Sequence, residues 1–180
     1  MTRDTDEPDM GFPVLYRRMA AYNALMTERV YAAAGQLSDA ERKADKGAFF
    51  RSVHSTLNHI LFADRAWMGR FTGRSYEIKG MGVDLYEDFE ALKAAHLAMC
   101  GDISAFCEEL TPKWLAGDLQ WTSGMDGIAR SRPRWLLVTH MFNHQTHHRG
   151  QLSTLLTQAG IDIGVTDLPF MPDLAEGDTT

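Results

Sequence analysis

The sequence predicts an all-α protein, a four-helix bundle with a long irregular connection between its third and fourth helices. Four long segments repeat apolar residues at steps of three and four, which is the period of an amphipathic helix. Strand signals are few, and the sequence contains no internal repeat. Because 180 residues can bury a core within one domain, we expect a single domain over 1–180. Its ends, 1–10 and 168–180, are expected to be extended or mobile.

The first predicted helix begins near Phe12 and closes near Gly35. Its apolar stripe consists of Phe12, Leu15, Met19, Tyr22, Met26, Val30 and Ala33. Ser38, followed three residues later by Glu41, forms a capping box, so a short helical turn is expected there.

The second and third predicted helices cover about 47–71 and 86–110. The second stops at Thr72-Gly73, and the third stops before Pro112, because glycine and proline interrupt helices.

The connection over 113–132 is rich in glycine and tryptophan, which favours a loop or a short, irregular hairpin. Pro133 then opens the fourth helix, in the first turn that proline tolerates. This helix continues to Ala159, where Gly160 supplies the C-cap. The remaining tail is expected to run over the surface.

The composition limits the kinds of partner. Apolar residues make up 44% of the chain, charged residues make up 23%, and the net charge is −6. A negative chain is poorly suited to nucleic acid or an anionic membrane, so neither is expected as a partner. The expected partner is a small-molecule substrate, on the grounds of the candidate site described below. The N-terminus is acidic and polar, unlike a targeting peptide, and the apolar runs are too short for a membrane span. A cytoplasmic location is therefore expected.

Two cysteines, Cys100 and Cys107, occur in the third predicted helix. Their spacing places them on one helix face, but about 10 Å apart along the axis, which is too far for a disulfide. We interpret them as reduced thiols of the core.

The fourth predicted helix contains four of the seven histidines, namely His140, His144, His147 and His148. At about 100° per residue, His144 and His148 fall in the middle of an apolar arc of about 80°. The other members of that arc are Leu137, Met141, Leu152 and Leu155. His140 and His147 lie at its edge.

Two imidazoles at i and i+4 in an apolar stripe suggest a metal site. Each ring has two nitrogens that need partners, and a buried unmet one costs roughly 1–3 kcal/mol. A polar layer within the core is the alternative. His59, on the second predicted helix, favours metal because it can complete a three-histidine site with His144 and His148. Such a site leaves coordination positions open for water or substrate.

Several residues around this pattern receive other interpretations. Gln145 occupies the position where zinc proteases have a catalytic glutamate, so that class is rejected. His54 and His96 are interpreted as polar residues of helix surfaces. Asp64 lies in an apolar stripe, and a buried carboxylate there needs a histidine N–H or an arginine nearby.

Arg149 and Gln151 follow His148 and are candidates for orienting substrate or for pairing with Asp64. A packing or salt-bridge role is equally open for each. No residue is identified as catalytic beyond these candidates.

The sequence also resembles a known family. The segments are Leu57-Asn58-His59-Ile60-Leu61 with Asp64 and Trp67, and Asn143-His144-Gln145-Thr146-His147-His148-Arg149-Gly150-Gln151. They resemble the DinB (damage-inducible) family of the DinB/YfiT-like superfamily, from about Met19 to Asp167. The chain departs from the family pattern at Leu25, where relatives often have tryptophan.

The resemblance implies a four-helix bundle, often a homodimer, with one divalent metal held by His59, His144 and His148. Zinc or nickel is the expected metal, with iron or copper as alternatives. Relatives include transferases and an isomerase that use a low-molecular-weight thiol. We therefore expect a metal-dependent thiol transferase. A metal-dependent hydrolase and a stress-responsive metal-binding protein without turnover are the alternatives.

Overall fold

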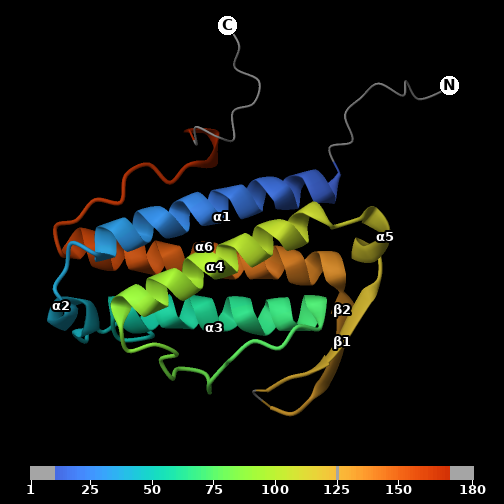
Figure 1. The fold of residues 1–180 in the computed structure, drawn as a ribbon, viewed down its shortest axis with the longest axis horizontal. Helices are drawn as coiled ribbons and strands as arrows, with labels where there is room; N and C mark the ends of the chain where they lie inside the picture. The colour runs from blue at the N-terminus through green and yellow to red at the C-terminus, as the bar shows by residue number, and fades with distance from the viewer. Residues whose placement is uncertain (1–10, 125, 171–180) are drawn as a thin grey trace, which may run out of the picture.

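Four long helices pack side by side in the computed structural model, which describes residues 11–124 and 126–170 (Figure 1). They are α1 (Phe12–Ala34), α3 (Val53–Thr72), α4 (Phe89–Glu108) and α6 (Arg134–Gln158). Helices α1 and α3 are diagonal to each other, because each of them contacts both α4 and α6. The predicted four-helix bundle is confirmed. So is the contact between the second and fourth long helices, on which a shared histidine site depends.

The shorter elements lie where the chain connects these helices. They are α2 (Asp39–Lys43), α5 (Pro112–Leu115), β1 (Asp118–Thr122), β2 (Ala129–Pro133) and the 3₁₀ turn η1 (Leu168–Phe170). Strands β1 and β2 form an antiparallel hairpin in which Trp121 is opposite Arg130. This confirms the irregular hairpin predicted between the third and fourth long helices. The capping box is also confirmed, since Ser38 Oγ accepts from the Glu41 N–H at 3.3 Å.

The predicted start of the second long helix near residue 47 is wrong. Gly47 and Arg51 have φ angles of 71° and 65°, in the left-handed region that a right-handed helix cannot use. A tight turn over 46–51 results, in which the Arg51 carbonyl accepts from the Lys46 N–H at 2.7 Å. Helix α3 begins after Ser52, whose Oγ accepts from the Ser55 N–H at 3.0 Å. This turn places the Phe50 ring beside His59.

The third long helix also begins later than predicted, at Phe89 rather than near residue 86. Asp88 is its N-cap and accepts from the Ala91 N–H at 2.8 Å, which satisfies a backbone donor of the first turn. At the fourth helix the prediction is right within one residue at each end, since Pro133 is the N-cap and Ala159 the C-cap.

The core between the helices is apolar, and side chains of all four long helices fill it. The largest fully buried members are Tyr16, Tyr31, Met26, Leu57, Leu61, Met68, Leu92, Ile103, Met141, Leu152 and Leu156. Cys100 and Cys107 are buried and unpaired, as predicted.

The surface positions predicted for His54 and His96 are wrong, because both side chains are buried. The segment before α4 covers His54, whose Nε2 lies 2.8 Å from the Tyr86 carbonyl oxygen. His96 faces the core from α4, with its Nδ1 3.1 Å from the Tyr31 hydroxyl. Each ring thus has a polar partner inside the bundle.

The described part of the C-terminal tail lies against α1. Ile163 is buried, and the Tyr22 hydroxyl donates to the Thr166 carbonyl at 2.9 Å. The predicted tails at 1–10 and 171–180 lie outside the described residues, whereas residues 168–170 form a 3₁₀ turn. None of the described helices combines the length and the apolar character that crossing a bilayer requires.

Candidate metal centre

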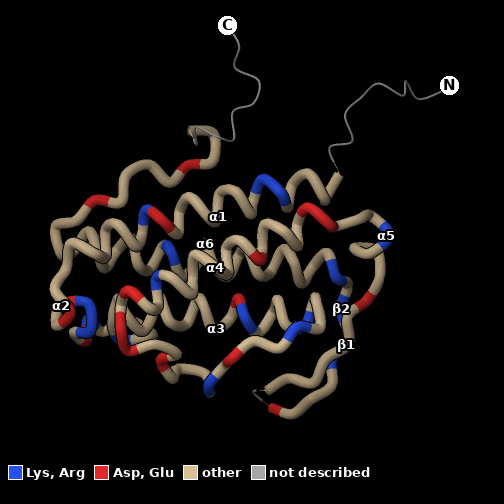
Figure 2. The backbone as a smooth tube through the Cα atoms, in the orientation of Figure 1, with Lys and Arg blue, Asp and Glu red and all other residues tan. Residues whose placement is uncertain are grey.

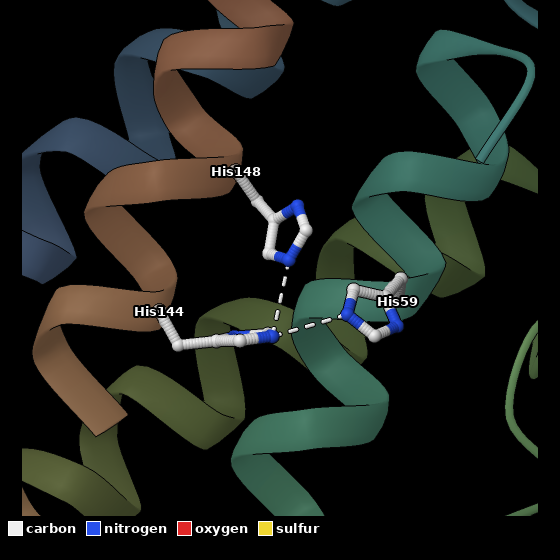
Figure 3. Close-up of side chains that lie close together, drawn as sticks. All are labelled: His59, His144 and His148. Carbon is white, nitrogen blue, oxygen red and sulfur yellow. Dashed lines mark hydrogen bonds between the residues drawn. The ribbon is translucent and has the colours of Figure 1, made fainter. Parts of the chain in front are cut away.

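Three histidine rings converge between α3 and α6 (Figure 3). His144 and His148 are one turn apart on α6, and His59 faces them from α3. The Nε2 atom of His144 lies 3.1 Å from the Nε2 atom of His59 and 3.1 Å from that of His148. One nitrogen from each ring lies within 4.8 Å of the other two, and the group could hold a metal ion. The structure thus brings together the three predicted ligands.

The cluster lies at the edge of the buried face of α6, not in its middle as predicted. His148 is buried, whereas His144 is partly exposed and His147 is exposed. The centre of the buried face is occupied by Gln145, whose side chain is fully enclosed. A position at the edge supports the rings from the core on one side while leaving the other side closer to solvent.

Burial keeps the three imidazoles neutral at physiological pH. Desolvation, with a smaller repulsion from His148, lowers the pKa of His59 to about 4. Desolvation and the neighbouring histidines lower the pKa of His144 to about 3. The pKa of His148 is lowered as well, mainly by burial. A neutral imidazole has a free lone pair, which is the form that binds a metal.

The hydrogen-bond pattern determines which nitrogen of His148 carries its proton. His148 Nδ1 lies 2.8 Å from Gln151 Oε1, and an amide oxygen can only accept, so Nδ1 donates. The neutral ring therefore presents a lone pair at Nε2, toward His144. Hydrogen bonds then satisfy the two 3.1 Å contacts poorly. A protonated His144 Nε2 would have to share one proton between both neighbours, and an unprotonated one could accept from His59 but would face the lone pair of His148.

A divalent cation fits this arrangement better than hydrogen bonds do, because it can accept all three lone pairs. Two imidazole nitrogens at 2.0–2.1 Å from one tetrahedral ion are about 3.3 Å apart, close to the two 3.1 Å separations in the cluster. The donor set, the protonation state and the spacing all agree with a transition metal.

Phe50 covers one side of the cluster. Its ring stacks on His59 with a centroid separation of 3.7 Å and an interplanar angle of 20°, and it meets His148 edge-on at 5.5 Å. The left-handed turn at Arg51 presents the ring in this position, and an ion pair from Arg51 Nε to Asp45 Oδ2, at 2.9 Å, braces the turn. Strained backbone of this kind concentrates at functional sites.

Asp64 lies apart from the histidine cluster, in the interior of the bundle. Its Oδ1 accepts from Gln145 Nε2 at 2.9 Å, and its Oδ2 lies 3.6 Å from His96 Nε2. The predicted need for a polar partner is confirmed, with a histidine supplied by α4 and an amide supplied by α6. Asp64 is therefore a structural residue that joins three helices.

Arg149 and Gln151 have separate roles, and neither bonds to Asp64. Arg149 is buried and donates to Asn23 Oδ1 on α1, and to Thr146 Oγ1 at 3.2 Å. It connects α6 to α1. Gln151 contacts His148 through its oxygen, and its nitrogen lies 3.3 Å from His147 Nε2.

The contributions of Phe50 and Gln145 do not follow from the sequence pattern as interpreted above. The apolar pattern predicts that Phe50 is part of a helix. The left-handed turn, for which Gly47 is the one sequence signal in this segment, instead directs its ring toward His59. The comparison with the zinc-protease motif identifies Gln145 only as a residue that cannot act as a catalytic base. On the helical wheel Gln145 lies between Leu152 on one side and Val138 and Leu156 on the other, and this apolar surrounding is the sequence signal of a buried polar contact.

The comparisons with known proteins agree with this fold. A DinB-like protein from Bacillus cereus ATCC 10987, known from a crystal structure, is similar with a TM-score of 0.57 and 21% identity. The match covers 78% of this chain and 89% of that one. At this level of identity the similarity shows the fold alone.

Two proteins of Bacillus subtilis (strain 168) are similar in sequence. Protein DinB is 24% identical over 156 residues, which cover 83% of this chain and 89% of that protein. Uncharacterized protein YrdA is 33% identical over 60 residues, covering 33% of this chain and 35% of that protein. The sequence profile of the DinB family matches residues 1–179. The chain therefore belongs to the DinB family.

Proposed function

We propose that this protein is a metal-dependent transferase that joins a low-molecular-weight thiol to a small electrophile. The observation that supports the proposal is the convergence of three neutral imidazoles at the edge of the bundle. Three protein ligands leave room for an exogenous one, which is typical of catalytic rather than structural sites. Zinc or nickel is the proposed metal, and iron or copper also suits the donor set.

A divalent ion held by the cluster would lower the pKa of a coordinating thiol, which is then deprotonated at neutral pH. The protein residues orient the reactants. Gln151 fixes the ring of His148, and Phe50 supports the ring of His59. In the reaction the thiol proton goes to solvent, and the sulfur forms a bond to the electrophilic carbon. The leaving group departs with the electron pair of the bond that breaks.

The arrangement gives less support to a hydrolase. A metal lowers the pKa of its bound water, and a nearby general base assists the attack further by accepting a proton. In residues 11–124 and 126–170 the metal-ligating group contains histidines and no carboxylate. The carboxyl of Asp64 is enclosed in the core and bonded to Gln145, so it is not placed to act as such a base.

The test is a thiol-transfer assay with the zinc-loaded and the nickel-loaded protein. A panel of small thiols is offered with 1-chloro-2,4-dinitrobenzene, and chloride displacement is followed by absorbance. We expect turnover that is lost in His148→Ala and retained in His147→Ala, a control that removes an exposed neighbouring ring. Equal rates in the wild type and in His148→Ala would overturn the proposal. Metal binding without turnover of any thiol would instead favour a stress-responsive binding protein.

Elemental analysis of protein purified without an affinity tag identifies the metal. Anomalous scattering from crystals of the same preparation places it. A stoichiometry of one ion per chain located between His59, His144 and His148 is expected.

A further inference from the structure

Arg70 is a half-buried cation in the last turn of α3. Its guanidinium carbon lies 4.7 Å from the centre of the Trp67 ring. Within residues 11–124 and 126–170 it forms neither a hydrogen bond nor an ion pair. The helix C-terminus and the indole ring both favour a positive charge there, but within the described residues none of its five N–H groups bonds to a carbonyl of α3 or to another side chain.

Arg70 occupies the same face of α3 as His59. The residues at steps of four, three and four from His59 are Ala63, Ala66 and Arg70, and these steps follow one stripe of a helix. Eleven residues correspond to about 16 Å along the axis. Ala63 is buried beside the neighbouring helices, whereas Ala66 is partly exposed, so between His59 and Arg70 the accessible part of this stripe carries a small side chain.

A row of aromatic rings runs beside this stripe. The ring of His140 lies 6.0 Å from that of His144 and meets the Trp67 ring edge-on at 5.2 Å. Trp121 of the hairpin meets Trp67 edge-on at 5.7 Å. The hairpin and the end of α3 lie at the same end of the bundle, where Figure 2 shows several Lys and Arg positions. The path from the cluster to Arg70 is thus aromatic, and it ends at a positive charge.

We propose that Arg70 binds the carboxylate of an elongated organic acid whose reactive atom is placed at the histidine cluster. The guanidinium fork matches the two oxygens of a carboxylate. Trp67 and Trp121 suit an apolar or flat portion of the same molecule. Since the His59 and Arg70 side chains span part of the 16 Å, the carboxylate and the reactive atom are separated by on the order of 10 Å. This inference rests on the proposed function, in which the acid is the thiol or its acceptor.

The partial burial of the Arg70 side chain favours an anionic partner for its guanidinium group. Desolvation lowers the pKa of Arg70, because removing a cation from water without a counter-ion disfavours the charged form. By contrast, Arg130 on strand β2, opposite Trp121, already has an anionic partner. Its two terminal nitrogens donate to the Asp126 carboxylate oxygens at 2.6 and 2.8 Å. Arg70 therefore remains the available cation beside the aromatic row.

Binding of two matched probes tests the subsite. The probes are biphenyl-4-carboxylate and the neutral biphenyl-4-carboxamide, and their Kd values for the zinc-loaded protein are measured by calorimetry. We expect the carboxylate to bind about tenfold more tightly than the amide. Arg70→Gln should reduce this preference to less than twofold, whereas the control Lys93→Gln, which removes an exposed charge from α4, should retain it. Equal binding of the two probes by the wild type, or a preference that persists in Arg70→Gln, would overturn the proposal.

Two further measurements separate the subsite from the metal and from catalysis. His148→Ala should retain the preference for the carboxylate, because binding at Arg70 does not use the cluster; loss of the preference in that variant would indicate a carboxylate bound to zinc and overturn the proposal. In the transfer assay, Arg70→Gln should raise KM for a carboxylated thiol without changing kcat. Failure of every thiol to react, with the Arg70-dependent preference intact, would overturn the proposed transferase but support the subsite.

Discussion

The Oε1 atom of Gln151 lies 2.8 Å from the Nδ1 atom of His148, less than one helical turn away on the same helix. Of the three clustered histidines, His148 has its remote nitrogen bonded to a partner, while the Nδ1 atoms of His59 and His144 are buried without one in the described part of the chain. Gln151 thereby fixes both the tautomer and the orientation of the ring.

Gln151→Leu should weaken zinc binding by about 10–100-fold, the range typical of partners that orient a metal ligand. Competition with a chromogenic chelator measures this change. Gln151→Glu retains an acceptor for the His148 N–H and should restore most of the affinity, which a purely steric role of Gln151 would not predict. Equal zinc affinity in the wild type and Gln151→Leu would show that His148 is oriented by other contacts.

His148→Ala should cost more zinc affinity than Gln151→Leu does, since it removes a predicted ligand. The matched control is His147→Ala, whose exposed ring lies beside His148 with a centroid separation of 4.8 Å. Cobalt substitution provides a second readout, because its visible absorption reports the number and geometry of ligands. A cobalt spectrum unchanged in His148→Ala would mean that this residue is not a ligand.

Phe50→Ala should lower zinc affinity by about 2–10-fold. A stacked aromatic pair contributes about 0.5–1.5 kcal/mol, and its loss frees the His59 ring to leave its position. Phe49→Ala is the control, because Phe49 is 78% exposed and packs on Phe50 rather than on a histidine. If both variants bind zinc as the wild type does, the stacking has no role in holding the site.

Gln145→Leu should destabilise the fold by about 2 kcal/mol, measured by urea denaturation of the metal-free protein. The substitution removes the hydrogen bond to Asp64 Oδ1 and leaves a carboxylate that is 1% exposed with His96 as its remaining close partner. The double variant Gln145→Leu with Asp64→Leu should recover part of this loss, because no buried carboxyl group is then left without its amide partner. Additive losses in the double variant would argue against the coupling.

The two cysteines should make the fold less stable above pH 9. Burial raises the pKa of Cys100 to about 11 and that of Cys107 to about 12, compared with 9.0 for an unhindered thiol. Between pH 9 and 11 the unfolded chain has lost thiol protons that the folded chain retains, so the free energy of unfolding decreases as pH rises.

The expected slope approaches about 1.4 kcal/mol per pH unit for each thiol. Denaturant titrations at pH 8 to 10.5 measure it, and a C100A/C107A variant should show a smaller slope. Thiol reagents at pH 8 should modify neither cysteine until the protein is unfolded. Rapid modification of the native protein would contradict the burial of both side chains.

The sequence by itself determined the class of fold and the composition of the cluster. Apolar periodicity is a local property, so α1 and α6 were predicted within about one residue at their described ends. The i, i+4 pair His144 and His148 follows from helix geometry alone. Its conjunction with His59 required only that the second and fourth long helices be neighbours, which they are.

Tertiary structure decided which polar side chains are enclosed and which rings support the site. His96 and His54 are buried because distant segments cover them, and a helical wheel of their own helices cannot reveal that contact. The turn at Arg51 places the Phe50 ring against His59. It depends on the positive φ angle of Arg51, which the apolar periodicity of the sequence does not predict. Three histidines could be named from spacing, but the 3.1 Å convergence of their Nε2 atoms exists only because two helices far apart in sequence pack against each other.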